Sequence, residues 1–294
     1  MANIISIASG KGGVGKSFFS ANLAMGMKNK GYKVLLVDGD LGGANLHNFV
    51  GLKTANVGIY NFLKEKQNIE NIIIDTPAGI KFIGGASDIL GMAHITNYEK
   101  LKIINTLKRL NYDFVIMDLG AGTSYNMIDF FNFSDKKIII MNSEPTSIEN
   151  SYGFIKIALY RMIEKSIKNN PLLEKIASRL RSRSKNYTKV SDIIEDIKSY
   201  DEKVVKVVEG IVDNYKVGMV LNMLKFKKEL NVFFGFENVA KKYLNISMEK
   251  LGFLPYDLSI QESLKRLEPF YFMTDNSFIK ERFDEIADNI IAKL

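Results

Sequence analysis

Short apolar runs alternate with longer amphipathic stretches along most of this chain. The apolar runs are rich in Ile and Val and have the length of buried strands; they cover residues 4–8, 33–37, 82–84, 114–117, 137–141, 217–221 and 250–254. Residues 17–30, 98–110 and 279–294 show helical periodicity, and each connects or follows a strand. This alternation predicts an α/β fold, a doubly wound and mostly parallel sheet of about seven strands with helices on both faces. Ligands of such sheets bind at the carboxyl ends of the strands.

One stretch interrupts this alternation. About 75 residues separate the predicted strands 137–141 and 217–221, far more than a single crossover helix requires. Residues 151–210 have the pattern of several helices and hold 13 Lys and Arg against 8 Asp and Glu, a net charge of +5. We therefore expect one domain over residues 1–294 with a basic, helical insertion at 151–210. Its charge fits a solvated helical face, or a docking surface for an acidic partner, an anionic lipid surface or nucleic acid.

Composition excludes several classes of protein. The chain has 294 residues, of which 46% are hydrophobic and 25% charged, and this is the composition of a globular protein with a substantial core. Its formal net charge is +7, so the rest of the chain outside residues 151–210 is close to neutral. The absence of cysteine excludes disulfide frameworks, thiolate metal sites and thiol nucleophiles. Neither a signal peptide nor an apolar run of about 18 residues is present, so we expect a cytoplasmic protein.

A glycine-rich segment lies directly between the first predicted strand and a predicted helix. Residues 10–17 read Gly-Lys-Gly-Gly-Val-Gly-Lys-Ser and satisfy the pattern G-x-x-x-x-G-K-[ST]. The glycines let the backbone turn so that its N–H groups point at phosphate oxygens, and the following helix adds its positive dipole end. Lys16 would reach the β- and γ-phosphates, and the Ser17 hydroxyl would ligate Mg²⁺. The segment therefore predicts a P-loop NTPase.

Two further predicted strands end in carboxylates that suit such a site. Residues 34–40 read Val-Leu-Leu-Val-Asp-Gly-Asp, and strand periodicity puts Asp38 and Asp40 on one side. Carboxylates beside a phosphate loop can orient an attacking water and hold the hydration shell of a metal. Two segments compete as the Walker B strand, one with Asp75 and one with Asp118. We choose Asp118, because its strand follows the helix at 98–110 and completes a βαβ unit, and we assign Asp75 to a turn.

A second lysine in the loop carries a family resemblance. Lys11 follows the first glycine, and in this the sequence resembles the deviant Walker A ATPases of the MinD/ParA family. The resemblance implies a dimer that encloses two nucleotides, in which Lys11 contacts the partner's phosphates. It also implies that Asp40 positions the hydrolytic water and that turnover is slow. The expected catalytic residues are Lys11, Lys16 and Asp40, and the expected Mg²⁺ ligands are Ser17, Asp38 and Asp118.

A later strand holds the candidate contacts to the base. Residues 220–223, Val-Leu-Asn-Met, resemble the adenine-contacting Leu-Asn-Arg of MinD, with Met223 in place of the arginine. The Asn222 amide suits the donor and acceptor edge of adenine, and residues 252–257 resemble the loop that closes over the base. Residues 29–32 lack the carboxylate of a guanine motif, so ATP is the expected nucleotide. The expected nucleotide contacts are Gly10, Gly12, Gly13, Val14, Gly15, Lys16, Ser17, Phe18, Asn222, Pro255 and Asp257.

Two segments favour one branch of the family. Residues 143–148 and 118–126 resemble the FlhG-like regulators of flagellar number, and the resemblance spans most of residues 1–150 and 217–294. The absence of cysteine argues against the nitrogenase iron protein and the Mrp-type iron–sulfur carriers. The resemblance implies an ATP-dependent homodimer that acts through a regulatory protein partner. The alternative is a ParA-like partition ATPase that binds DNA nonspecifically through basic residues, namely Arg179, Arg181, Arg183 and Lys185.

The C-terminal segment departs from the family pattern. MinD and FlhG end in a basic amphipathic helix, whereas residues 278–294 place Ile279, Phe283 and Ile286 on one face with acidic residues around it. Acidic flanks repel anionic lipid, so we expect a core-packing helix and weak or absent membrane association. Residues 233–236, Phe-Phe-Gly-Phe, are expected to form a hydrophobic loop or a dimer rim.

Overall fold

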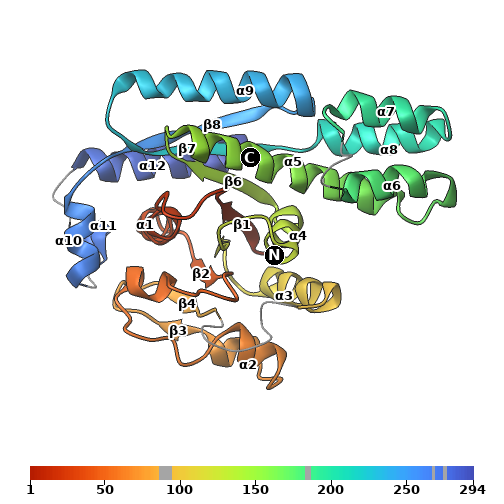
Figure 1. The fold of residues 1–294 in the computed structure, drawn as a ribbon. Helices are drawn as coiled ribbons and strands as arrows, with labels where there is room; N and C mark the ends of the chain where they lie inside the picture. The colour runs from red at the N-terminus through yellow and green to blue at the C-terminus, as the bar shows by residue number, and fades with distance from the viewer. Residues whose placement is uncertain (86–94, 183–186, 267–268, 274–276) are drawn as a thin grey trace.

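Eight strands form one sheet in the computed structural model, which describes residues 1–85, 95–182, 187–266, 269–273 and 277–294 (Figure 1). Their order is β3-β4-β2-β5-β1-β6-β7-β8, and every neighbouring pair is parallel except β3 with β4. This confirms the predicted doubly wound, mostly parallel α/β sheet. The strands are β1 (Asn3–Ala8), β2 (Val34–Asp38), β3 (Ile74–Asp75), β4 (Lys81–Ile83), β5 (Phe114–Asp118), β6 (Lys136–Met141), β7 (Val217–Leu224) and β8 (Met248–Pro255).

Helices cover both faces of the sheet. The α-helices are α1 (Lys16–Asn29), α2 (Ile59–Leu63), α3 (Asn97–Arg109), α4 (Tyr125–Phe133), α5 (Pro145–Ile167), α6 (Glu174–Arg181), α7 (Val190–Lys198), α8 (Glu202–Asp213), α9 (Asn231–Leu244), α10 (Ser259–Arg266), α11 (Phe270–Met273) and α12 (Ser277–Lys293). Short 3₁₀ helices are η1 (Leu46–Val50), η2 (Ile69–Ile72), η3 (Pro171–Leu173) and η4 (Lys227–Leu230). One apolar layer joins the sheet to α3–α9, and the other joins it to α1, α11 and α12.

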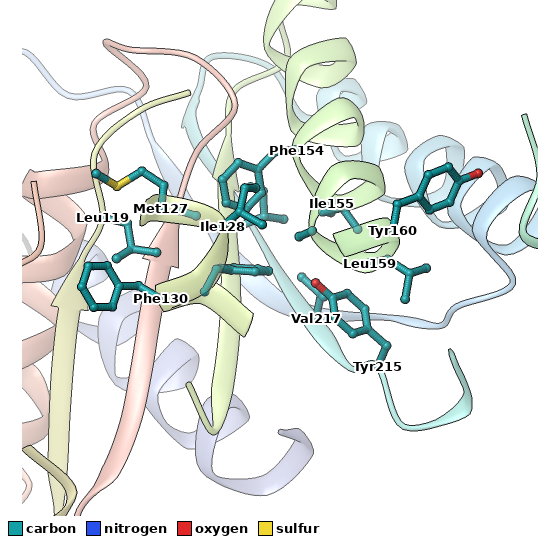
Figure 2. Close-up of a cluster of buried hydrophobic side chains, with 14 of the residues drawn as sticks. Leu119, Met127, Ile128, Phe130, Phe154, Ile155, Leu159, Tyr160, Tyr215 and Val217 are labelled. Carbon is teal, nitrogen blue, oxygen red and sulfur yellow. The ribbon is translucent and has the colours of Figure 1, made fainter. Parts of the chain in front are cut away.

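The central strand β1 explains why the apolar runs are continuous. Ile4 and Ala8 face one layer while Ile5 and Ile7 face the other, and all four are fully buried. A strand that is covered on both faces favours apolar residues at almost every position, which is typical of parallel sheets, and the small Ser6 is the one buried polar residue of β1. Figure 2 shows part of the first layer, where side chains of α4 and α5 pack over the strands. This two-sided core positions the carboxyl ends of β1, β2 and β5 side by side.

The long interval before β7 is helical. It starts with α5, which packs on α4 and β6, and continues into α6, α7 and α8, which pack on α5, α9 and each other. In Figure 1 these three helices lie together beyond the end of α5. Arg179 pairs with Asp196 at 3.3 Å, and Arg181 pairs with Glu164 and Glu174. The other two basic residues expected to contact DNA, at positions 183 and 185, lie outside the described residues.

Two predictions from sequence need correction. The sheet has an additional edge strand, β3, which is only two residues long and antiparallel, so neither its length nor its direction fits the parallel pattern. Residues 233–236 are not a loop, because they lie within the helix α9. Phe233 and Phe236 are buried three positions apart on the inner face of that helix, whereas Phe234 is exposed.

The last helix packs into the core. α12 buries Ile279, Phe283, Ile286 and Ile290 against β8 and α1. Lys30, the residue directly after α1, pairs with Asp288 of α12 at 2.8 Å, so the polar side of α12 is also held against α1. The predicted core-packing role is therefore confirmed. In the part of the chain that the structure describes, we find no helix with the length and apolarity to cross a membrane.

Candidate functional site

The glycine-rich loop joins β1 to α1 and depends on glycine at specific positions. Gly15 is the residue before α1, and it has a left-handed φ of 83° that disfavours any side chain. A Cβ at this position would also lie 2.3 Å from Nδ2 of Asn222. Gly10 faces a different restriction, because a Cβ there would lie 2.1 Å from the carbonyl carbon of Asn150 in α5. The loop is thus held between β7 on one side and α5 on the other.

The carboxylates of Asp38 and Asp118 meet at the carboxyl ends of two neighbouring strands. β2 and β5 are parallel, and their register places Asp38 directly opposite Asp118. Asp118 accepts hydrogen bonds from Ser17 Oγ at 2.7 Å and Ser20 Oγ at 2.6 Å, and its Oδ1 lies 2.8 Å from Lys16 Nζ. One carboxylate therefore gathers the lysine and both hydroxyls at the start of α1.

Asp38 is almost fully buried beside this group. Its two oxygens accept hydrogen bonds from the backbone N–H groups of Asp40 and Leu46, each at 3.1 Å. Burial, together with the nearby charge of Asp118, raises the pKa of Asp38 to about 7, although these two hydrogen bonds oppose the shift. A cation in this position would favour the ionised form of both carboxylates.

Asp40 lies at the mouth of the same region. Its Oδ1 accepts hydrogen bonds from the N–H groups of Gly42 and Gly43 at 3.1 and 3.0 Å, so the carboxylate is fixed by its own turn. The loop after β5 passes next to it, because a Cβ on Gly120 would lie 2.9 Å from the Asp40 carboxyl carbon. Asp40 is half-buried and therefore accessible to water.

These groups surround a cavity of about 330 Å³. Its lining includes the predicted residues Gly12, Gly13, Gly15, Lys16, Ser17, Phe18, Asp38, Asp40 and Asp118. Backbone N–H groups of a glycine loop, the start of a helix and one lysine form a setting for phosphate. The hydroxyl and the two buried carboxylates supply the oxygen ligands that Mg²⁺ prefers. Among the described residues, no group of three or more acidic or histidine side chains is arranged to hold a metal ion.

A second cavity of about 240 Å³ adjoins the first, and it is mostly apolar. Asn222, Pro255 and Asp257 line it, as predicted for contacts to a base. The Asn222 Nδ2 donates to the backbone oxygen of Val14 at 2.8 Å, which leaves the Oδ1 of the same amide available as an acceptor. Met223 also lines it, at a position where the β7–β8 register is irregular and φ is +60°.

Four of the residues considered in the sequence do not line either cavity. Gly10 lies against α5, and Val14 is buried and contributes its carbonyl to Asn222. Lys11 points to the start of α5, where its Nζ lies 2.8 Å from Glu144 Oε2 and 3.1 Å from Thr146 Oγ1. Asp75 was expected in a turn but ends the edge strand β3, where it is 82% exposed and pairs with Lys81 of β4; two strands, β4 and β2, separate β3 from the strand of Asp118.

Several residues of the site have no local motif in the sequence. Phe49 lines both cavities from η1, and Tyr256 and Ile260 line the apolar one. Ser20 holds Asp118 and could have been found, because it lies three positions after Ser17 on the same face of a helix. Nothing in the sequence around Phe49 marks that residue as a neighbour of the phosphate loop.

Comparisons with known proteins agree with this geometry. The model of the AAA domain family matches residues 2–175. Antiactivator FleN of Pseudomonas aeruginosa is 22% identical over 98% of this chain and 85% of its own length. Flagellum site-determining protein YlxH of Helicobacter pylori is 37% identical, and the match spans 52% of each chain, about half of that relative. The septum site-determining protein MinD of Pyrococcus horikoshii, solved with Mg-ADP, has a TM-score of 0.68 at 22% identity over 100% of this chain and 97% of that chain.

Proposed function

The chain belongs to the AAA domain family and is a MinD/ParA-type ATPase that uses ATP and Mg²⁺, and from this premise we propose that it acts as an ATP-driven dimerisation switch. In this proposal the switch is FlhG-like and regulates the number or placement of flagella. The names of two relatives, an antiactivator FleN and a flagellum site-determining YlxH, support that assignment.

The nucleotide would lie across the two adjoining cavities. The triphosphate fits the glycine loop and Lys16, and the base fits between Asn222, Pro255 and the neighbouring apolar side chains. The Asn222 Oδ1 would accept a hydrogen bond from the adenine amino group, which guanine lacks at that position. Ser17, Asp38 and Asp118 would hold Mg²⁺, which when bound neutralises phosphate charge.

The position of Lys11 is the observation that carries the dimer proposal. Although it lies within the phosphate loop, its side chain lines neither cavity and is 39% exposed. Its ion pair with Glu144 is solvent-exposed and therefore costs little to exchange for another anion. This orientation supports the proposal that Lys11 contacts the phosphates of a second subunit rather than those of its own.

Hydrolysis would then depend on the arrangement around Asp40. This carboxylate is fixed by its turn beside Gly120 and faces the cavity, so it could orient a water molecule toward the γ-phosphate. The acceleration would come from positioning and from electrostatic stabilisation by Lys16 and Lys11. Because the second lysine comes from the partner, hydrolysis requires the dimer. We expect slow basal turnover, which a regulatory protein partner would accelerate.

The Asp40→Ala variant tests this cycle. It should bind ATP, hydrolyse it far more slowly, and accumulate as a dimer when its mass is measured by light scattering with ATP and Mg²⁺. Adding Lys11→Gln should return the variant to a monomer that still binds ATP. Lys206→Gln, in which an exposed lysine of α8 is changed, is the matched control and should leave the dimer intact. A monomeric Asp40→Ala protein in saturating ATP would contradict the cycle.

DNA retention tests the ParA-like alternative. Arg179 and Arg181 pair with three carboxylates, Asp196, Glu164 and Glu174, so these two arginines and their partners carry no excess positive charge, which weakens the case for a DNA-binding surface among the described residues of α6. We expect no ATP-dependent binding to nonspecific DNA at low salt. Retention that requires ATP and falls steeply as salt is raised would favour the partition ATPase instead.

A further inference from the structure

A third cavity lies away from the nucleotide site. It has a volume of about 420 Å³ and shares no lining residue with the other two. It is enclosed by the start of α4, one side of α5 and the end of α6. The residues that define its chemistry are Tyr125, Lys156, Ile157, Tyr160, Arg161 and Arg181. This volume is within the range that accommodates small organic ligands.

Lys156 is the uncompensated charge in this cavity. It is half-buried, and no carboxylate among the described residues pairs with it. Its nearest aromatic neighbour is Tyr160, whose ring centre lies 5.2 Å from the ammonium. Burial lowers the pKa of Lys156, because the ammonium loses hydration and no carboxylate among the described residues pairs with it in return. An anion in the cavity would supply that compensation.

The charges around the cavity leave it positive. Arg161 binds Asp129 through two hydrogen bonds of 2.8 and 3.1 Å, and the same carboxylate also holds Lys100 and Lys165. Five cations therefore face three carboxylates in this cluster, an excess of two positive charges; they are Lys100, Lys156, Arg161, Lys165 and Arg181 against Asp129, Glu164 and Glu174. Such an excess in a concave site attracts anions.

The remaining walls are aromatic and aliphatic. Tyr125 is 62% exposed, and its ring lies 4.4 Å from the Arg161 guanidinium. Ile157 is 40% exposed, although it lies in the same concave surface. A flat aromatic ring would cover these exposed side chains, and an anionic group attached to the ring could contact Lys156. A simple inorganic ion would leave these walls in contact with water.

We propose that this cavity is a binding site for a small organic anion that carries a carboxylate or phosphate on an aromatic body. Lys156 binds the anionic group, and Tyr125 and Ile157 contact the ring. Tyr125 is the first residue of α4 and directly follows the loop that passes Asp40. Occupancy should therefore change ATP turnover, and this regulatory part rests on the proposed function.

Binding of 1-naphthyl phosphate tests the site directly. The chain has no tryptophan, so naphthalene fluorescence anisotropy can be followed without an indole background. The titration uses protein saturated with Mg-ADP, so that the phosphate loop is occupied and the proposed dimer is not required. 2-Naphthoate gives the carboxylate arm of the test, and 2-naphthol gives an uncharged probe with the same ring.

The expected result is specific to Lys156. Lys156→Met should weaken binding of 1-naphthyl phosphate about tenfold or more, since a charge-assisted contact is lost. Lys156→Arg should retain most of the affinity, and Lys206→Met on α8 should bind as the unchanged protein does. Tighter binding of 2-naphthoate than of the phosphate would identify a carboxylate ligand, and the reverse would identify a phosphate.

Several results would overturn the proposal. The first is that 1-naphthyl phosphate does not bind to the ADP-saturated protein. The second is that Lys156→Met binds this probe as tightly as the unchanged protein, and the third is that 2-naphthol binds as tightly as the anionic probes. If the probe binds as expected but saturation leaves the ATPase rate unchanged, the regulatory part is wrong and the binding site stands. A failure of the dimerisation switch would not affect the anisotropy titration, so the two proposals fail separately.

Discussion

Replacing Gly10 with alanine should force the phosphate loop away from α5. The new Cβ would lie 2.1 Å from the carbonyl carbon of Asn150 and 2.3 Å from the backbone nitrogen of Ser151. Real Cβ contacts essentially never fall below 3.0 Å, so the separation must grow by about 0.9 Å. Both opposing atoms are backbone within a helix, so no side chain can rotate away to relieve the contact.

The magnitude follows from the cost of overpacking, which is about 1–3 kcal/mol. With an unfolding entropy of about 2.1 cal/mol/K per residue, 1 kcal/mol corresponds to roughly 1.6 °C in a chain of 294 residues. Gly10→Ala should therefore lower the melting temperature by about 2–5 °C. A loop displaced by nearly 1 Å also misplaces the N–H groups that hold phosphate, so ATP affinity should fall about tenfold or more.

Two glycines provide controls. A Cβ on Gly12, two residues along the same loop, would meet nothing within 4 Å, so Gly12→Ala should leave the melting temperature unchanged. Gly210 in α8 is equally open and remote from the nucleotide, so Gly210→Ala should leave ATP affinity in isothermal titration unchanged. If Gly10→Ala melted at the same temperature as Gly12→Ala and bound ATP normally, the close approach to α5 would not restrain the loop.

Two further predictions concern buried polar groups. Asp129→Asn should lower the free energy of unfolding in urea by about 3 kcal/mol at pH 7, because three basic side chains would lose a buried carboxylate. Burial alone would raise the pKa of Asp129, but the hydrogen bonds from the three basic side chains hold this pKa well below its ordinary value. The ionised Asp129 therefore contributes its full stabilisation of the folded state above about pH 4, and this contribution is lost as the pH falls further. The difference between the two proteins should accordingly shrink below that pH. Asn222→Ala should weaken ATP binding about tenfold in isothermal titration. The Val14 carbonyl loses the hydrogen bond from the Asn222 amide, and the adenine amino group loses the Asn222 oxygen as its acceptor. GTP binding should change less, because guanine has no amino group at that position.

The sheet and the phosphate loop could be predicted because their signals are local. Strands covered on both faces give continuous apolar runs, and the loop requires glycine and lysine at set positions within eight residues. Residues 233–236 were harder to interpret, since three phenylalanines around a glycine hide the helical spacing of Phe233 and Phe236. The segment of Asp75 was a candidate strand, but β3 has only two residues, and nothing in its sequence indicates that it pairs antiparallel with β4 at the edge of the sheet.

The arrangement of the site depends instead on partners that are distant in sequence. Ser17 is held by a carboxylate 101 positions away, Lys11 by one 133 positions away, and Val14 by an amide 208 positions away. The motif identifies the chemistry of the loop, but it does not say where each side chain is held. That difference matters most for Lys11: the sequence gives the loop an additional lysine, and only the fold directs it away from its own cavity toward the surface at the start of α5. The direction of Lys11, on which its proposed contact with a second subunit depends, is therefore set by the start of α5, which lies more than 100 residues beyond the loop.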